Sequence, residues 1–181
     1  MTNPQQNHDQ VQDQLELFNQ QSLQQSIKYM QRPILFRLMT YRILPLGAFA
    51  RLRVDHASHE ECTVSIPGGW ATRNPFGSTY WAAQGMAAEA ASGLLPFMYC
   101  RAAPHKVNMI LASCEAKFIR QCRGRSTFSC EGGESTRKAI IATLETGERE
   151  LCTHKVIGRD TAGEIVSEWT FTWSLKRSSK S

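Results

Sequence analysis

One segment, residues 74–100, constrains the fold more than any other part of the chain, and it reads NPFGSTYWAAQGMAAEAASGLLPFMYC. An Asn-Pro-Phe-Gly turn leads to Ser78 or Thr79, whose hydroxyl groups can cap the first turn of a helix. The helix that follows carries apolar residues on every face, so we expect other elements to enclose it. We predict this central helix over about residues 78–95, because Pro96 ends it at the latest.

A single acid interrupts this apolar helix. From Gly77 through Cys100, Glu89 is the only residue of the Asp, Glu, Lys, Arg or His kind before Arg101. Burying a carboxylate without partners is costly or makes it take up a proton. Two explanations stay open: Glu89 serves binding or catalysis, or it is a structural acid satisfied by Ser92, by the main chain or by a basic residue of the sheet.

Length and charge narrow the class of protein. The 181 residues suffice for one domain with a sizeable core, and the 20% share of charged residues is ordinary for a water-soluble chain. The net charge of +5 mildly favours anionic partners. The N-terminal tail is slightly acidic, so we expect no nucleic-acid binding. Without a signal peptide or an apolar run of ~18 residues, we expect a cytoplasmic protein and no stable membrane insertion.

The six cysteines form no C-x-x-C pair, so zinc-ribbon patterns are absent from the sequence. His56, His59 and Cys62 are spaced by three but fall around a turn between two predicted strands, so their side chains need not converge. We therefore predict no metal site and read the cysteines as reduced, mostly apolar residues.

The first 31 residues contain ten glutamines and are predicted to form a polar, partly helical tail. Pro33 can open a short helix to about Tyr41, with Ile34, Leu35, Leu38 and Tyr41 on its apolar side. Five arginines and no acid occur over residues 32–53. This segment is either a membrane-surface or phosphate-binding face, or a solvated rim of a covering helix and first strand.

Alternating apolar residues predict six strands around the central helix. Two precede it, at residues 48–55 and 61–66. Four follow it, including a long strand over about 106–120 whose inward side is Ile110, Ala112, Cys114, Ala116 and Phe118. A short helix between Ser135 and Gly147 interrupts them, and the last strand buries Trp169, Phe171 and Trp173. Short turns between most strands favour an antiparallel sheet, which gives an α+β architecture. The predicted organisation is a single domain over residues 32–176 between the tail at 1–31 and a polar C-terminal tail at 177–181.

A curled antiparallel sheet wrapped round one long helix, entered through an Asn-x-x-Gly turn, resembles the hotdog fold of acyl-thioester enzymes and binders. Residues 45–175 resemble more narrowly a bacterial domain of unknown function related to PaaI-type thioesterases. In PaaI-type enzymes a motif of Asn, then Gly, then His-Gly-Gly opens the helix. A carboxylate follows seven residues after the second Gly of His-Gly-Gly. Here Asn74 matches the Asn in approximate position and Glu89 falls on the carboxylate. Tyr80, Trp81 and Ala82 stand where His-Gly-Gly is expected.

The resemblance implies an acyl-CoA hydrolase in which Glu89 and Asn74 are catalytic. Gly77, Tyr80, Trp81 and Ala82 would then contact the substrate, with main-chain N–H groups around Trp81 and Ala82 stabilising the oxyanion. It implies no cofactor, with coenzyme A only as part of the substrate, and a homodimer or dimer of dimers whose subunit interface completes the site.

Two alternatives to hydrolysis remain open at this stage. Because the helix entrance departs from the PaaI pattern, the protein can instead be a non-catalytic module that binds or senses acyl-CoA or fatty acid. A third hypothesis is a peripheral membrane adaptor that uses the arginines of residues 32–53.

Overall fold

The computed structural model describes residues 14–179. Three helices come first: α2 (Gln20–Met30), α3 (Pro33–Ile43) and α4 (Pro45–Phe49). Strands β1 (Arg53–Ala57) and β2 (Cys62–Ile66) and the 3₁₀ turn η1 (Trp70–Thr72) lead to the long helix α5 (Trp81–Ala102). The chain then continues through β3 (Val107–Phe118), β4 (Ser126–Cys130), α6 (Gly133–Thr146), β5 (Arg149–Arg159) and β6 (Ile165–Arg177). Residues 1–13 of the predicted tail and the last two residues of the C-terminal tail lie outside the described part.

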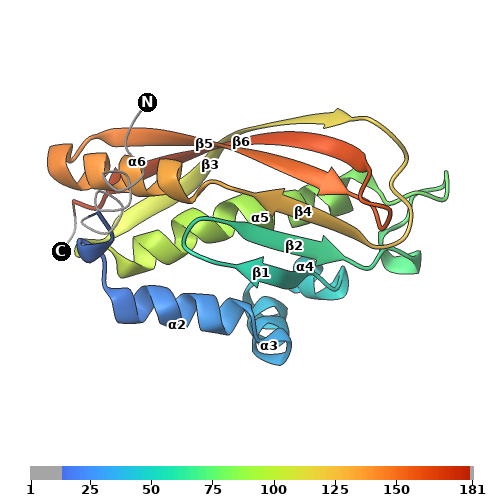
Figure 1. Cartoon of the computed structure of the whole chain (residues 1–181), viewed down its shortest axis with the longest axis horizontal. Helices are drawn as coiled ribbons and strands as arrows, with labels where there is room; N and C mark the ends of the chain where they lie inside the picture. The colour runs from blue at the N-terminus through green and yellow to red at the C-terminus, as the bar shows by residue number, and fades with distance from the viewer. Residues whose placement is uncertain (1–13, 180–181) are drawn as a thin grey trace.

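The six strands form one antiparallel sheet in the order β1-β2-β4-β5-β6-β3. The sheet curls round α5, and α2 and α3 cover the side of α5 that the sheet leaves open (Figure 1). The predicted α+β architecture, six antiparallel strands round one long helix with helices added at the N-terminal side, is confirmed.

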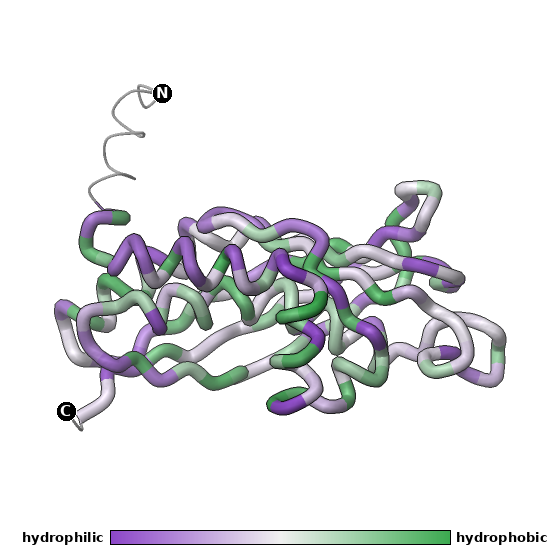
Figure 2. The backbone as a smooth tube through the Cα atoms, turned by 90° about the horizontal axis from the view of Figure 1, so that it is seen from below, coloured by the Kyte–Doolittle hydropathy of each residue, from purple (hydrophilic) through white to green (hydrophobic). Residues whose placement is uncertain are grey.

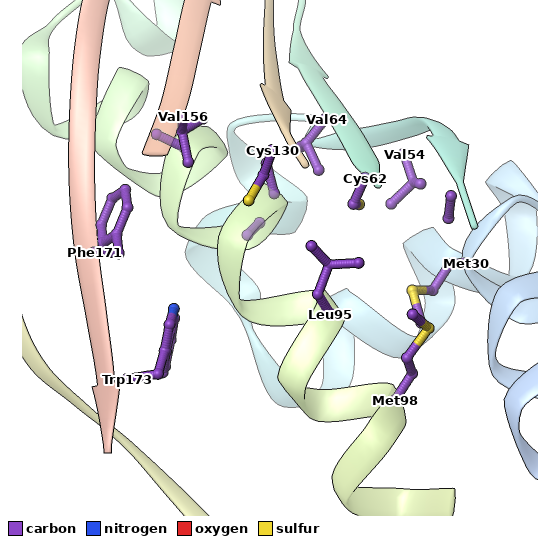
Figure 3. Packing of buried hydrophobic residues seen from close by; sticks show 14 of the residues in the cluster. Met30, Val54, Cys62, Val64, Leu95, Met98, Cys130, Val156, Phe171 and Trp173 are labelled. Carbon is purple, nitrogen blue, oxygen red and sulfur yellow. The ribbon is translucent and has the colours of Figure 1, made fainter. Parts of the chain in front are cut away.

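The core lies between α5 and the inner face of the sheet. Leu95 and Met98 of α5 are 1% exposed, and Figure 3 shows them beside β1, β2 and α2, while Phe171 and Trp173 of β6 lie on the other side of the helix. The predicted burial of Trp169, Phe171 and Trp173 is confirmed. Small residues on α5 let the sheet approach closely, since a Cβ atom added at Gly93 would lie 2.8 Å from the Trp173 ring.

The predicted bounds of the central helix are wrong at both ends. The helix begins at Trp81 because Thr79 forms a bridge with Arg73 and its N–H bonds to the Cys122 carbonyl, which keeps residue 79 extended. At the other end the helix runs through Pro96 to Ala102. Proline lacks the N–H that would bond to the carbonyl of Ser92, four residues earlier.

A histidine on the sheet satisfies that carbonyl. The Nδ1 atom of His154, on β5, lies 3.0 Å from the Ser92 oxygen, and its Nε2 atom lies 3.0 Å from the Thr136 hydroxyl on α6. All three residues are buried, and burial lowers the pKa of His154 and keeps the ring neutral. The proline is tolerated because the sheet supplies the hydrogen bond that the helix lost.

Two predictions for the first strand and the helix before it are also wrong. Residues 45–49 are helical and β1 begins only at Arg53, so the predicted strand at 48–55 is displaced. Helix α3 has the predicted position, but it packs through Phe36 and Thr40, each 4% exposed. Its predicted apolar side therefore faces outward.

The predicted inner face of strand β3 is right in its second half and wrong in its first half. The strand is one of the two edge strands of the sheet, and a bulge between Leu111 and Ser113 shifts its register. After the bulge, Cys114 and Ala116 lie opposite the buried Phe171 and Trp169 of β6, as predicted.

Phe118 is 49% exposed, but its ring contacts the buried Trp169 ring edge-to-face. Before the bulge, Leu111 and not Ile110 lies opposite the buried Trp173, and Ile110 is 64% exposed. An alternating pattern predicts which residues share a face, but a bulge exchanges the two faces along the strand, and the pattern does not show where a bulge falls.

Candidate active site on the central helix

Asn74 organises the turn that precedes α5. Its Oδ1 atom accepts hydrogen bonds from the main-chain N–H of Phe76 (3.0 Å) and of Ser78 (3.2 Å), and from the Ser78 hydroxyl (3.2 Å). Gly77 closes the turn with a φ of +73°, a left-handed conformation that glycine adopts at little cost. The side-chain oxygen of Asn74 is therefore committed to the turn, and a catalytic role would fall on its NH₂ group.

The first turn of α5 presents free main-chain donors. The N–H groups of Ala83 and Gln84 both bond to the Tyr80 carbonyl, whereas those of Trp81 and Ala82 have no acceptor within residues 14–179. Such orphan N–H groups at a helix N-terminus can bind an anion or a polarised carbonyl oxygen. Tyr80 is 46% exposed and Trp81 56% exposed, and their rings contact each other edge-to-face at this end of the helix.

A cavity of about 400 Å³ lies at this end of the helix. It brings three predicted site residues together, namely Asn74, Tyr80 and Trp81, with residues that follow β3 on its other wall. Gly77 and Ala82 do not line it. Gln84, at its inner end, donates to the Thr79 carbonyl and accepts from Ser167, which makes Gln84 a structural link between α5 and β6.

Glu89 lies in a different place, half-buried on α5 and facing the gap between α5 and β3. Burial raises the pKa of its carboxyl group. The Cys114 thiol on β3 is close enough for the charge of Glu89 to add to the effect of burial in raising the pKa of Cys114. A higher pKa lowers the fraction of Cys114 that is present as thiolate, the nucleophilic form.

The Glu89 carboxylate has no hydrogen-bond or ion-pair partner in the part of the chain that the structure describes. Ser92, expected as its partner in the structural explanation, donates instead to the main-chain carbonyl of Glu89 (3.0 Å) and accepts from the Trp173 indole N–H (3.2 Å). An unpaired acid in a partly desolvated position is a feature of functional sites.

An apolar cavity of about 220 Å³ adjoins Glu89. Sequence reasoning missed one side of its wall, because helix α3 supplies Phe36, Met39, Thr40 and Ile43 from far away in the chain. A second cavity, of about 370 Å³ between α2, α3 and α5, shares four lining residues with the first: Phe36, Met39, Leu94 and Phe97. The two spaces therefore lie side by side along α5.

The predicted site residues thus fall into two groups on one helix. Eight residues separate Trp81 from Glu89, which places the free N–H groups about 12 Å along the axis from the carboxylate. A single thioester group is too small to contact both ends. In the described residues no group of three or more His, Cys, Asp or Glu side chains is placed to hold a metal ion. The same part of the chain contains no helix long and apolar enough to cross a membrane.

The fold of this chain is the hotdog fold, and solved structures described as a probable and a putative thioesterase share its architecture. The match to the family described as Domain of unknown function (DUF4442) covers residues 33–175, so the chain belongs to that family. Comparison with curated proteins gives no match.

Three solved structures illustrate the similarity. A protein of unknown function from Pseudomonas aeruginosa, described as a probable thioesterase, shares 21% identity with a TM-score of 0.68 over 83% of this chain and 99% of its own. A protein of unknown function from Chlorobaculum tepidum shares 12% identity with a TM-score of 0.67 over 90% of this chain and 98% of its own. A thioesterase from Haemophilus influenzae shares 12% identity with a TM-score of 0.57 over 72% of this chain and 82% of its own. At these identities the likeness concerns the fold.

Proposed function

We propose that the protein hydrolyses acyl thioesters, with acyl-CoA as substrate and Glu89 as the catalytic carboxylate. The observation that carries the proposal is the state of Glu89, which is desolvated, without a partner within residues 14–179, and exposed to an apolar cavity. The descriptions of the Pseudomonas and Haemophilus proteins as thioesterases support the same reaction class. Coenzyme A enters as part of the substrate, and the proposed chemistry uses no cofactor.

In this mechanism the Glu89 carboxylate takes a proton from a water molecule, and the water oxygen forms a bond to the thioester carbonyl carbon. The tetrahedral intermediate then collapses and the C–S bond breaks. Protonated Glu89 returns its proton to the leaving thiolate, which yields a free acid and coenzyme A. Burial raises the pKa of Glu89, and this makes the carboxylate a stronger base at the pH where it remains ionised.

The acyl chain is proposed to lie in the cavity between α3 and α5. Apart from Glu89 and Thr40, the residues that line it are apolar, and the Thr40 hydroxyl already donates to the Phe36 carbonyl (2.9 Å). The neighbouring cavity along α5 offers room for a longer chain. Removing an aliphatic chain from water into this space contributes about 0.8 kcal/mol for each buried CH₂ group.

Stabilising the oxyanion requires donors that the same helix cannot bring to Glu89. The free N–H groups of Trp81 and Ala82 are suited to this role but lie about 12 Å away along the axis. We therefore propose a homodimer in which the N-terminal end of α5 from one subunit meets the carboxylate of the other. Each site then uses both subunits, as it would also in a dimer of dimers.

Strand β3 supports this assembly. It is a twelve-residue edge strand without proline, and an unpaired edge of that length invites pairing with another chain. Ile110, Leu111 and Phe118 are apolar and exposed along it.

We expect Ile110→Asp to convert the dimer to monomers in light scattering and to lower hydrolysis. A monomeric wild-type protein with full activity would contradict the shared site.

A second candidate function is acyl-ligand binding without turnover. Tyr80 and Trp81, in place of small residues at the helix entrance, favour it because their rings restrict access to the free N–H groups. This candidate predicts a rise in melting temperature with acyl-CoA or fatty acid and no release of free acid.

The decisive assay follows free acid by mass spectrometry, because six cysteines disturb thiol-capture reagents. Purified protein is incubated with short, long and aromatic acyl-CoAs, and wild type is compared with Glu89→Gln. We expect hydrolysis of at least one of these, lost in Glu89→Gln without loss of folding. Ligand-induced stabilisation without hydrolysis would favour the binding module, and the absence of both would reject both candidates.

A further inference from the structure

Helices α3 and α4 carry a cluster of large apolar side chains that point away from the molecule. These residues, which we call the α3–α4 surface, are between 41% and 76% exposed. Ile34, Leu38 and Tyr41 follow one side of α3 at helical spacing. Figure 2 views the molecule from the side on which α2 and α3 lie in Figure 1. The α3–α4 surface consists of Ile34, Leu38, Tyr41, Ile43, Leu44, Leu46 and Phe49.

Arginines are interleaved with these apolar residues. Arg32, Arg37, Arg42 and Arg51 are all exposed, and none of them has an ion-pair partner among residues 14–179. No acid occurs between residues 32 and 54. The neighbouring helix α2 has no acid either and adds Lys28. The charge on this side of the molecule is therefore positive and uncompensated.

The helix is held firmly in this orientation. Phe36 and Thr40 face inward and are 4% exposed, so the side of α3 that packs on the body is fixed. An arrangement of this kind, with large apolar groups and arginines on the same outer surface of a docked helix, is the composition of segments that lie in the interface of an anionic membrane. The arginines bind lipid phosphates while the apolar side chains enter the acyl boundary.

A second copy of the chain fits this surface poorly. A two-fold contact would place the same four arginines against each other, with no acid of the segment to compensate them. Charge complementarity favours an anionic partner instead. Arg37 and Arg51 line one hollow together with Tyr41, Leu46 and Phe49. Positive charges thus lie directly beside apolar side chains, as binding to a lipid phosphate above its acyl chains requires.

We propose that the α3–α4 surface binds the face of an anionic phospholipid bilayer, with α3 and α4 lying in the plane of the membrane. Ile43 and Leu44 belong to this surface and also line the cavity beside Glu89. Docking through α3 therefore brings that cavity next to the lipid. Membrane binding itself depends only on the surface, so it stands or fails independently of thioester hydrolysis.

The test is vesicle flotation with the full-length protein. Vesicles of phosphatidylcholine alone are compared with an equimolar mixture of phosphatidylcholine and phosphatidylglycerol, at low and high salt. We expect binding to the anionic vesicles that weakens as salt screens the arginines. Replacing both Arg37 and Arg42 by Gln is expected to lower partitioning roughly 30-fold, since each arginine near an anionic surface contributes about one kcal/mol.

Two further variants separate lipid binding from folding. Leu38→Asp removes an exposed apolar contact and is expected to reduce binding, whereas Leu151→Asp, at a residue 58% exposed on β5, serves as the matched control and should bind like wild type. Arg51→Gly removes a charge where φ is +61°, a conformation that glycine adopts freely. Its fold is therefore expected to stay intact while binding falls.

Several results would overturn the proposal. No flotation with anionic vesicles would do so, as would equal binding to neutral vesicles, or binding that the Arg37 and Arg42 substitutions leave unchanged. Self-association that Leu38→Asp abolishes would assign the surface to a second copy. Circular dichroism and melting temperature establish that each variant is folded, so loss of binding in a folded variant supports the proposal.

Discussion

The two ends of the candidate site on α5 contrast in how their polar groups are satisfied. At the N-terminal end Asn74 gives its oxygen to three donors of its own turn, and Gln84 joins the helix to β6. Eight residues after Trp81, Glu89 is half-buried beside an apolar cavity and has no partner within residues 14–179. The Glu89 carboxylate is therefore not occupied by structural hydrogen bonds, whereas the side-chain oxygens of Asn74 and Gln84 are.

The largest expected effect separates these two positions. Glu89→Gln should lower hydrolysis by about 10²–10⁴-fold, the range for loss of a general base. Asn74→Asp keeps the oxygen that the turn needs and removes the NH₂ group, so activity should stay within a few-fold of wild type. Steady-state rates from mass spectrometry provide the measurement. If Asn74→Asp is as inactive as Glu89→Gln, the NH₂ group of Asn74 is catalytic, and the assignment of Asn74 to a structural role is wrong.

The next effect concerns the hydrogen bond from His154 to the Ser92 carbonyl, one turn after Glu89 on α5. His154→Leu leaves the buried Ser92 carbonyl without a donor, and we expect a loss of about 1–3 kcal/mol in the free energy of unfolding. Urea denaturation measures this loss. Thr153→Leu, at an exposed neighbour on the same strand, is the control and should cost much less. Equal stability of His154→Leu and wild type would show that the Pro96 position needs no such support.

Packing along α5 offers a smaller, graded comparison. An alanine at Gly93 would place its Cβ atom 2.8 Å from the Trp173 ring, whereas one at Gly85 would lie 3.3 Å from Trp169. Overpacking at Gly93 is expected to cost about 1–3 kcal/mol. At Gly85 the higher helix propensity of alanine, about 1 kcal/mol, should offset most of the strain. Melting temperatures in which Gly85→Ala is the more damaging change would contradict this packing.

The smallest expected effect is the pH dependence of stability. Burial raises the pKa of Glu89 above its ordinary value, so the folded state holds this proton more tightly than the unfolded state. Stability should therefore fall as pH rises from the unfolded pKa through the folded pKa, and the loss ends above the folded pKa. Glu89→Gln should remove this contribution and be the more stable protein at neutral pH. Parallel curves for the two proteins in urea titrations at several pH values would show that the acid is not desolvated.

The sequence was sufficient to predict the architecture, because an apolar helix and alternating strands depend on local pattern. It was insufficient wherever a distant residue decides the outcome. The helix runs past Pro96, and His154, 62 residues after Ser92 along the chain, lies where it can replace the missing donor. The alternation in β3 places Ile110 inward because it does not show the bulge that shifts the register after Leu111. The spacing of Ile34, Leu38 and Tyr41 on α3 likewise does not show that this side is exposed, because apolar residues alone do not tell a core from a surface.

For the candidate site, the sequence indicated the acid but not the residues that surround it. Glu89 stood out as a lone acid in an apolar helix, and its cavity agrees with that expectation. The cavity wall from α3 was not foreseen, since Phe36 and Met39 lie far from Glu89 in sequence, and no local pattern records which helix will cover that acid.

The most direct test of the account is a crystal structure of Glu89→Gln with intact acyl-CoA bound. We predict that the acyl chain lies between α3 and α5, with the thioester carbonyl beside position 89. An acyl chain in the other cavity, between Asn74 and the residues after β3, with the thioester remote from position 89, would contradict it.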